Sequence, residues 1–312
     1  MKKAGYNVDV LDFSKTPLFV LNSYDILHFS SYFYGEHTWK LFFVNHPKKV
    51  LTVHGWLKNE LLYMLKHGRL GLRAIIGALL SLAMWPIFPL LFDVNTCPSR
   101  RTADGARLKN ATIIKNAIFP ERYLDVYPIN VKSNPKQLVF VCCSSGALKE
   151  EELIIDKVIA VVNRLNDLLT QQNDIVLLLF GNVRKKVNPK SVHFMGYSRD
   201  FLNFLKGSDL LILDYSYPDF SYVAMESAAL GIPIAKFSEK VSLEEIMTNQ
   251  TGFLARTDDE MVQILLDYAA NVAYFKPKLA AALRQYVQEE RSWAKIAPIW
   301  SDLFSKLLRD RE

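Results

Sequence analysis

The apolar residues of this chain fall into short runs that alternate with longer stretches of helical periodicity. Runs such as Ile175–Gly181 (IVLLLFG) and Leu210–Leu213 (LLIL) are almost continuously apolar, as expected of strands covered on both faces of a sheet. Strand and helix in alternation predict parallel sheets with crossover helices. We expect strands at residues 8–13, 25–29, 49–54, 94–99, 111–115, 137–143, 175–181, 192–195, 210–213 and 233–237, and helices at 100–109, 150–171, 199–206, 223–230 and 258–270.

The alternation lapses at residues 125–136 (DVYPINVKSNPK), where Pro, Asn, Ser and Lys accumulate and predict a linker. The 312 residues suffice for two α/β domains of ordinary size. The predicted fold class is α/β, with two Rossmann-like, doubly wound domains facing across a cleft. A ligand is expected in that cleft, at the carboxyl ends of the strands. The first domain is placed at residues 1–130, and the second begins at residue 131.

One apolar segment raises the question of a membrane. Residues 74–92 carry no charge over 19 positions, near the ~20 residues that a span requires, but Pro86 and Pro89 interrupt them. Residues 56–73, just before, are basic as well as apolar, which suits a helix lying on an anionic membrane surface. Three alternatives stay open for residues 56–92: a buried core helix, peripheral membrane contact, and a span.

Composition narrows the class of partner. The net charge of +6 favours anionic partners, but no nucleic-acid-binding motif accompanies it, so we expect no nucleic acid. The three cysteines form no disulfide framework and no CxxC pair, which favours a cytoplasmic location, at the inner face of the membrane if peripheral contact is made. Six scattered histidines predict no zinc site. The opening Met1-Lys2-Lys3 is not that of a signal peptide.

Residues 209–234 (DLLILDYSYPDFSYVAMESAALGIPI) carry the strongest resemblance to a known family. A strand, a loop and a helix there resemble the donor-site segment of the retaining, GT-B-fold glycosyltransferases of group 1 (family 4). Glu226 stands where the second carboxylate of the family's pair stands. Pro218 occupies the place of the first carboxylate, with Asp219 beside it.

Other stretches follow the family in order and spacing. Residues 113–119 (IIKNAIF) resemble its interdomain "IPNG" turn, with Asn116 matched and Ala117 in place of Gly. Residues 292–300 resemble the terminal helix that returns to the first domain, which places a donor domain at 131–288 and this helix at 289–312. Residues 142–145 replace a Gly-Arg segment, and the family's first strand and Gly-rich loop have no counterpart in this chain. Further similar stretches are Gly181, 194–197, 251–254, 25–28 and 52–55.

The resemblance assigns a donor site to the second domain. Glu226 would accept the two ribose hydroxyls in charge-assisted hydrogen bonds, the alternative being a solvated helix glutamate. The start of the helix would bind the β-phosphate through its free amide groups, the alternative being an ordinary cap by Asp219 or Ser221. The donor-binding residues expected are Glu226, Asp219, Phe220, Ser221, Tyr222, Val223, Gly181, Asn116 and Gly55.

Two residues are expected to act in catalysis. His54 ends a strand and would contact the donor sugar, the alternative being a core histidine; His28 sits similarly with weaker support. Lys149 would neutralise the departing diphosphate in place of a metal, the alternative being a solvated helix start. The basic residues 184–186 are an alternative phosphate contact.

The expected function is therefore glycosyl transfer, of the hexosyltransferase type (EC 2.4), from a nucleotide-sugar donor to a glycan, lipid or small-molecule acceptor. The resemblance implies retention of configuration, with the leaving phosphate helping to deprotonate the acceptor. No metal and no cofactor are expected, the nucleotide-diphosphate sugar being a substrate. The alternatives are a GT-B-fold binding or partner subunit that lacks catalysis and, less well supported, a sugar-nucleotide 2-epimerase.

Overall fold

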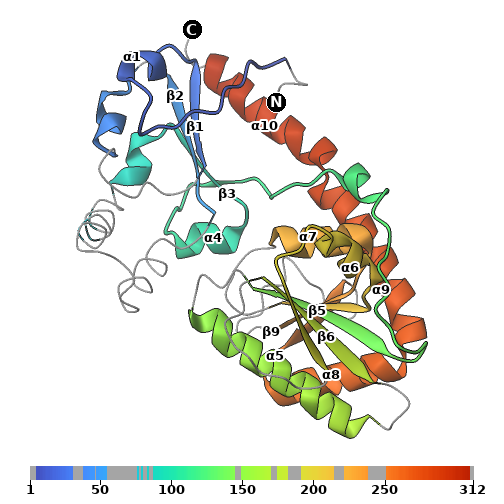
Figure 1. Cartoon of the computed structure of the whole chain (residues 1–312). Helices are drawn as coiled ribbons and strands as arrows, with labels where there is room; N and C mark the ends of the chain where they lie inside the picture. The colour runs from blue at the N-terminus through green and yellow to red at the C-terminus, as the bar shows by residue number, and fades with distance from the viewer. Residues whose placement is uncertain are drawn as a thin grey trace. The chain divides into compact units, whose positions relative to one another are not determined.

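The computed structural model divides the chain into two compact units. Unit 1 combines Met1–Asn116 with Trp293–Glu312, and unit 2 is Ala117–Ser292 (Figure 1). Each unit contains a parallel β-sheet with helices packed on it, in agreement with the predicted α/β class. The structure describes residues 5–30, 38–45, 47–54, 76, 79, 83, 87–144, 149–169, 174–181, 191–213, 221–237 and 251–309.

The sheet of unit 1 has four parallel strands in the order β1-β2-β3-β4. They lie close to the strands predicted at 25–29, 49–54, 94–99 and 111–115. The strand order follows the chain order. In the described part of this sheet, each strand is therefore added on the same side of the one before it. The strands are β1 (Ile26–Ser30), β2 (Lys48–Thr52), β3 (Val94–Cys97) and β4 (Thr112–Ile113).

The strand predicted at residues 8–13 is wrong. Tyr6 anchors this stretch to the terminal helix, because its hydroxyl lies 2.9 Å from Ser305 Oγ and its ring meets Phe304 edge-on. Val10 beyond it is 98% exposed, and Asp12 starts a turn by accepting hydrogen bonds from the backbone and side chain of Ser14. Phe13 packs on the core of unit 1, where its ring meets that of Phe29 edge-on. Val8, Val10 and Leu11 stay exposed, and the stretch forms no strand.

The two faces of the unit 1 sheet are covered by different parts of the chain. Helix α10 (Trp293–Arg309) covers one face, where Phe304 and Leu307 pack on Val50. Residues Leu27, Phe29 and Leu51 point to the other face. That face is covered by α1 (Leu18–Leu21), η2 (Thr38–Phe43), η3 (Phe88–Leu91) and α4 (Arg100–Gly105).

The sheet of unit 2 has six parallel strands in the order β10-β9-β8-β5-β6-β7. The predicted strands from 137 to 237 are confirmed. Strand β10 and helix α9 were not among the predicted elements. The strands are β5 (Leu138–Ser144), β6 (Ile175–Gly181), β7 (Val192–Gly196), β8 (Leu210–Leu213), β9 (Ile234–Phe237) and β10 (Gly252–Ala255).

Helices cover both faces of this sheet, as the continuous apolar strands require. Alternate residues of β5 divide between two cores, with Phe140 on one face and Val141 on the other. The first face carries α5 (Lys149–Leu168) and α8 (Asp258–Ala270), and the second carries α6 (Phe201–Gly207) and α7 (Tyr222–Leu230) (Figure 1). Helix α9 (Val272–Tyr286) contacts both cores, with Leu279 in the first and Leu283 in the second.

The segment predicted as a linker packs on unit 2. The Ile118 amide donates to the Arg291 carbonyl at 3.0 Å, so the two passages of the chain between the units lie side by side. Further along, the Ile129 amide donates to the Asn203 carbonyl at 3.0 Å. These contacts explain why the units divide at 116/117 and 292/293, whereas the sequence placed the divisions at 130/131 and 288/289.

Residues 56–92 lie mostly outside the described residues. Four large apolar side chains that the structure describes there are exposed: Ile76 by 50%, Leu79 by 52%, Ile87 by 48% and Leu90 by 80%. Ile76 and Leu79 are helical and three positions apart, so they share one helix face. These four side chains are therefore not part of a buried core. Within the described parts of the chain, no helix is long and apolar enough to cross a membrane.

Candidate functional site

The strand order of unit 2 reverses between β5 and β8. From β5 the chain builds outward through β6 and β7, and then returns to build β8, β9 and β10 on the other side. In open α/β sheets, a ligand binds outside the carboxyl ends of the strands at such a reversal. Strands β5 and β8 end at Ser144 and Leu213. The topology of the sheet therefore predicts a ligand site beside these two strand ends.

Helix α7 begins in the connection that follows β8. Ser221 is its N-cap, with the side-chain oxygen accepting from the Ala224 amide at 3.2 Å. The cap that the sequence left open between two residues is thus made by Ser221. The amides of Tyr222 and Val223 belong to the first turn, where no intrahelical acceptor exists, and the helix dipole favours an anion there. Gly231, at φ +74°, ends the helix in the left-handed region.

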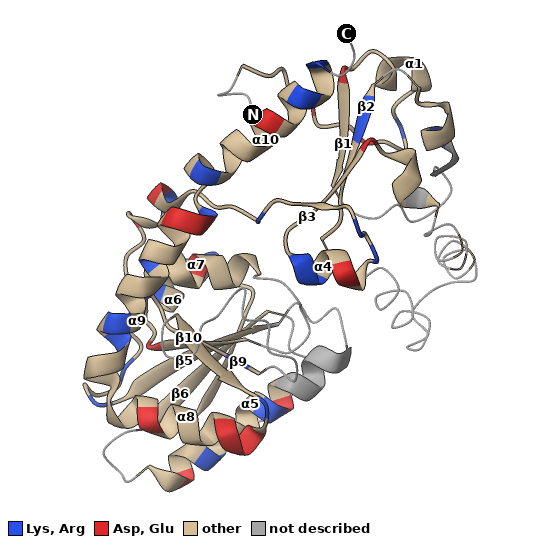
Figure 2. Cartoon of the chain, turned by 180° about the vertical axis from the view of Figure 1, so that it is seen from behind, with Lys and Arg blue, Asp and Glu red and all other residues tan. Residues whose placement is uncertain are grey.

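Glu226 is the one acidic residue of α7 (Figure 2). Its side chain is half-buried, and the Tyr123 hydroxyl of η4 (Pro120–Tyr123) donates a hydrogen bond to its carboxylate. Burial raises the pKa of Glu226, and the hydrogen bond from Tyr123 lowers it in part. Burial, and then the charge of Glu226, raise the pKa of Tyr123. The carboxylate is therefore positioned by a neighbouring hydroxyl and is partly withdrawn from water.

Tyr123 is a residue that sequence reasoning missed. It lies just after the stretch that resembles the interdomain turn, far from α7 along the chain, and packs with the core on the α7 face of the sheet. A local pattern cannot reveal such a contact. The only available signal was an aromatic residue in a segment otherwise typical of a linker.

Gly181 ends β6 at φ +97°. It pairs in register with Ser144, the last residue of β5, so it lies at the edge where the strand order reverses. Because only glycine adopts this backbone conformation readily, a side chain at position 181 would be strained. The strand end beside β5 is thus kept free of a side chain.

The candidate residues of unit 1 meet at the carboxyl half of β1 and β2. Ser30 Oγ and His54 Nε2 lie 3.0 Å apart, and both residues are exposed. His28 keeps part of its side chain exposed, with Nε2 at 2.6 Å from Thr52 Oγ1 and its ring 4.8 Å from that of Trp300. Burial, and then the nearby His54, lower the pKa of His28 to about 4. His28 is thus a neutral histidine that contacts Thr52 and Trp300, and His54 is an exposed residue and not a core histidine.

The remaining candidates are placed only in part. Asn116 is partly buried and is the last residue of unit 1 before unit 2 begins. Lys149 begins α5, but its side chain is not described. Lying outside the described residues are Gly55, Asp219, Phe220 and the basic residues 184–186. The structure therefore brings the α7 residues together, and places His54 beside His28 and Ser30.

Among the residues that the structure describes, no cluster of three or more His, Cys, Asp or Glu side chains could hold a metal ion. None of the three cysteines forms a disulfide, and Cys97 and Cys142 are buried.

Comparison with known proteins agrees with the geometry of unit 2. Residues 137–271 match the family "Glycosyl transferases group 1". The chain carries a group 1 glycosyltransferase domain. The matched residues span all six strands of the unit 2 sheet and helices α5 to α8. The protein is accordingly a transferase of the glycosyltransferase class (EC 2.4). No curated protein sequence matches the chain.

Solved structures resemble the glycosyltransferase over both units. Sucrose-phosphate synthase from Thermosynechococcus elongatus is 14% identical, with a TM-score of 0.70 over 92% of this chain and 74% of the synthase. HepE from Anabaena, in complex with UDP and glucose, is 13% identical, with a TM-score of 0.65 over 93% of this chain and 80% of HepE. A glycosyltransferase from Rickettsia africae ESF-5 is 16% identical, with a TM-score of 0.61 over 96% and 84%. At these identities the likeness shows the fold, which is that of the GT-B glycosyltransferases.

Proposed function

We propose that this glycosyltransferase moves a sugar from a nucleotide-diphosphate sugar to a glycan, lipid or small-molecule acceptor, with retention and without a metal ion or cofactor. One observation carries the proposal: a half-buried carboxylate, Glu226, lies on the helix that starts at the reversal of strand order in unit 2. HepE, similar in fold, is described in complex with UDP and glucose, which supports a nucleotide sugar as the donor here.

Unit 2 would hold the nucleotide. The Glu226 carboxylate can accept both ribose hydroxyls while keeping the hydrogen bond from Tyr123, since an ionised carboxyl group has about four acceptor positions. The first-turn amides of α7 would bind the β-phosphate, with Ser221 fixing the helix start and Asp219 and Phe220 leading into it. Gly181 would leave room for the donor at the end of β6.

Residues outside this helix would act on the reacting centre. His54 would contact the transferred sugar, with Gly55 and Asn116 beside the donor. Lys149 would neutralise charge on the departing diphosphate, which is worth several kcal/mol in a water-excluded site. The leaving phosphate would then help to take the proton from the acceptor, as retention requires.

The test is turnover with UDP-, GDP- and ADP-linked hexoses, followed as release of the nucleoside diphosphate. Glu226→Gln keeps the shape of the side chain and removes its charge, so we expect a loss of activity of at least tenfold. Glu121→Gln, an exposed glutamate of η4, is the matched control. Equal activity of Glu226→Gln and the control would remove the site from the proposal.

A second candidate is a GT-B-fold binding subunit without catalysis. Pro218 in place of the family's first carboxylate, and Cys142 and Cys143 in place of its Gly-Arg segment, favour it. Calorimetry separates the two. Nucleotide binding without turnover of any donor would establish the second function, whereas turnover would exclude it.

We also propose that the protein is cytoplasmic and that residues 56–92 make peripheral contact with the inner face of the membrane. The exposed Ile76, Leu79 and Leu90 support an apolar contact, and the basic residues in 56–73 would add attraction to anionic lipids. Flotation with vesicles of phosphatidylglycerol and phosphatidylcholine is the direct experiment. Leu79→Ser with Leu90→Ser should reduce binding, and binding should weaken with salt. Absence of binding at low salt would exclude the contact.

A further inference from the structure

The parallel pairing of β1 and β2 gathers polar groups on one side of the unit 1 sheet. Register pairs His28 with Val50 and Ser30 with Thr52. Since side chains alternate along a strand, Ser30 lies on the same side as His28. Val50 on that side packs under α10, and the His28 ring lies 4.8 Å from the ring of Trp300. The buried part of this side is thus apolar, and its carboxyl edge is polar.

A chain of hydrogen bonds fixes His28 and its protonation. The Thr96 hydroxyl donates to the Leu51 carbonyl, so it accepts from the Thr52 hydroxyl, 2.7 Å away. Thr52 then has no proton left for His28 and accepts from it, at 2.6 Å. A neutral imidazole carries one N–H, so the proton of His28 sits on Nε2. His28 is therefore committed as a donor within the fold.

The second imidazole of this edge, His54, is held differently. It follows β2, is exposed, and meets the Ser30 hydroxyl through Nε2 at 3.0 Å. A hydroxyl rotates to donate or accept, so Ser30 suits either tautomer of His54 while limiting the rotation of its ring. Ser30 is the last residue of β1, with its backbone fixed by pairing to Thr52.

We propose that Ser30 is a positioning residue that orients the imidazole of His54 toward the reacting sugar. This inference rests on the proposed function, in which His54 contacts the donor sugar. Holding one ring nitrogen determines the direction in which the other one points. Ser30 would thus act on the chemistry through His54, without touching the substrate itself.

The experiment compares Ser30→Ala with Ser30→Thr, which keeps a hydroxyl, and with Ser23→Ala, another exposed serine of unit 1. The first readout needs no substrate: nitrogen-15 NMR of the His54 ring reports its tautomer and its pKa. Ser30→Ala should shift the Nε2 signal and the titration of His54, whereas Ser30→Thr and Ser23→Ala should leave both near those of the wild type. Unchanged His54 signals in Ser30→Ala would overturn the proposal.

The second readout is steady-state kinetics. Ser30→Ala should lower kcat five- to tenfold with little change in KM and should alter the pH profile of kcat, and Ser30→Thr should recover most of the loss. A folded Ser30→Ala variant with wild-type kcat and pH profile would show that the hydrogen bond has no part in turnover. If the wild type lacks transferase activity while the His54 signals still respond to Ser30→Ala, the proposed function fails and the positioning of His54 stands.

Discussion

Gly207, the last residue of α6, lies against the backbone of Ile129. A β-carbon on Gly207 would stand 2.0 Å from the Ile129 carbonyl oxygen and 2.8 Å from its carbonyl carbon. Two hydrogen bonds also join the segment around Ile129 to α6. The Ile129 amide donates to the Asn203 carbonyl, and Lys206 donates to the Val126 carbonyl. The segment before β5 is therefore seated backbone to backbone on α6, and glycine is what permits it.

Gly207→Ala should consequently destabilise unit 2. Alanine in place of glycine ordinarily stabilises a helix by up to about 1 kcal/mol, but here the added methyl group meets backbone, and overpacking of this kind costs about 1–3 kcal/mol. Hydrogen exchange should show loss of protection at the Ile129 amide. Gly105→Ala, at the exposed last position of α4, is the control; an equal effect of the two substitutions would contradict the close packing.

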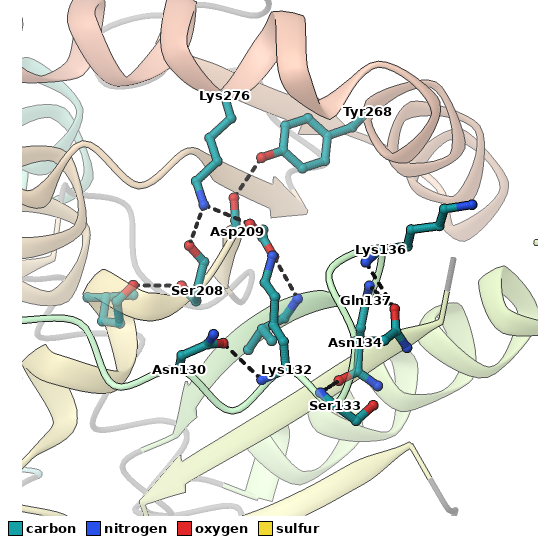
Figure 3. Close-up of polar contacts among 12 residues, drawn as sticks. Asn130, Lys132, Ser133, Asn134, Lys136, Gln137, Ser208, Asp209, Tyr268 and Lys276 are labelled. Carbon is teal, nitrogen blue, oxygen red and sulfur yellow. Dashed lines mark hydrogen bonds and ion pairs between the residues drawn. The ribbon is translucent and has the colours of Figure 1, made fainter. Parts of the chain in front are cut away.

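Asp209 joins three separate parts of unit 2 (Figure 3). Its buried carboxylate lies 2.8 Å from Lys132 Nζ and 2.7 Å from Lys276 Nζ, and it accepts from the Val139 amide at 2.9 Å. Asp209→Asn would leave two lysines without their counterion, and we expect a loss of about 3 kcal/mol in the free energy of unfolding. Urea denaturation measures it. Asp174→Asn, at an exposed position of the same unit, should stay within about 0.5 kcal/mol of wild type.

His28 should make the stability of unit 1 depend on pH. The pKa of His28 falls from 6.5 to about 4 on folding. Between pH 6.5 and pH 4, His28 is therefore protonated in the unfolded chain and neutral in the folded chain. The free energy of unfolding should therefore be constant above about pH 7 and fall with pH down to about 4. Because the His28 side chain is partly exposed, solvent screening should keep this loss below about 2 kcal/mol. Denaturation of wild type and His28→Leu at pH 7 and pH 5 checks it, since the variant should lack this part of the slope.

Tyr123→Phe should impair donor binding through Glu226. Without the hydroxyl the carboxylate loses the hydrogen bond that lowers its pKa, so protonation should abolish binding at a higher pH than in wild type. Calorimetric titration of UDP between pH 5 and pH 8 measures the shift. Tyr127→Phe, an exposed tyrosine of the same segment, should behave as wild type. A binding profile unchanged by Tyr123→Phe would separate Tyr123 from the donor site.

Much of the fold could be predicted because strands buried on both faces appear in the sequence as continuous apolar runs. The runs at β6 and β8 are apolar throughout and were located to the residue. The run at residues 8–13 is interrupted by Asp9 and Asp12, and it forms no strand. Helix α9 was missed, and Pro277 inside it lowers the helical signal of that stretch.

The site could be predicted only where it is local. Ser221 and Glu226 lie on one short helix, and a single stretch of sequence contains both. The contacts of Glu226 with Tyr123 and of His54 with Ser30 join residues from different elements, and only the packing of the units creates them. In particular, the register of β1 against β2 places Ser30 beside the end of β2, where His54 follows.

Helix α10 has a consequence for the order in which the protein can mature on the ribosome. It covers Val50 and the side of the β1–β4 sheet around it, yet every residue of unit 2 is synthesised between that sheet and the helix. Domains usually fold in the order of their synthesis. Here the first unit must wait with one apolar side uncovered until translation has passed residue 309, so unit 2, although encoded later, is the one that can be completed first.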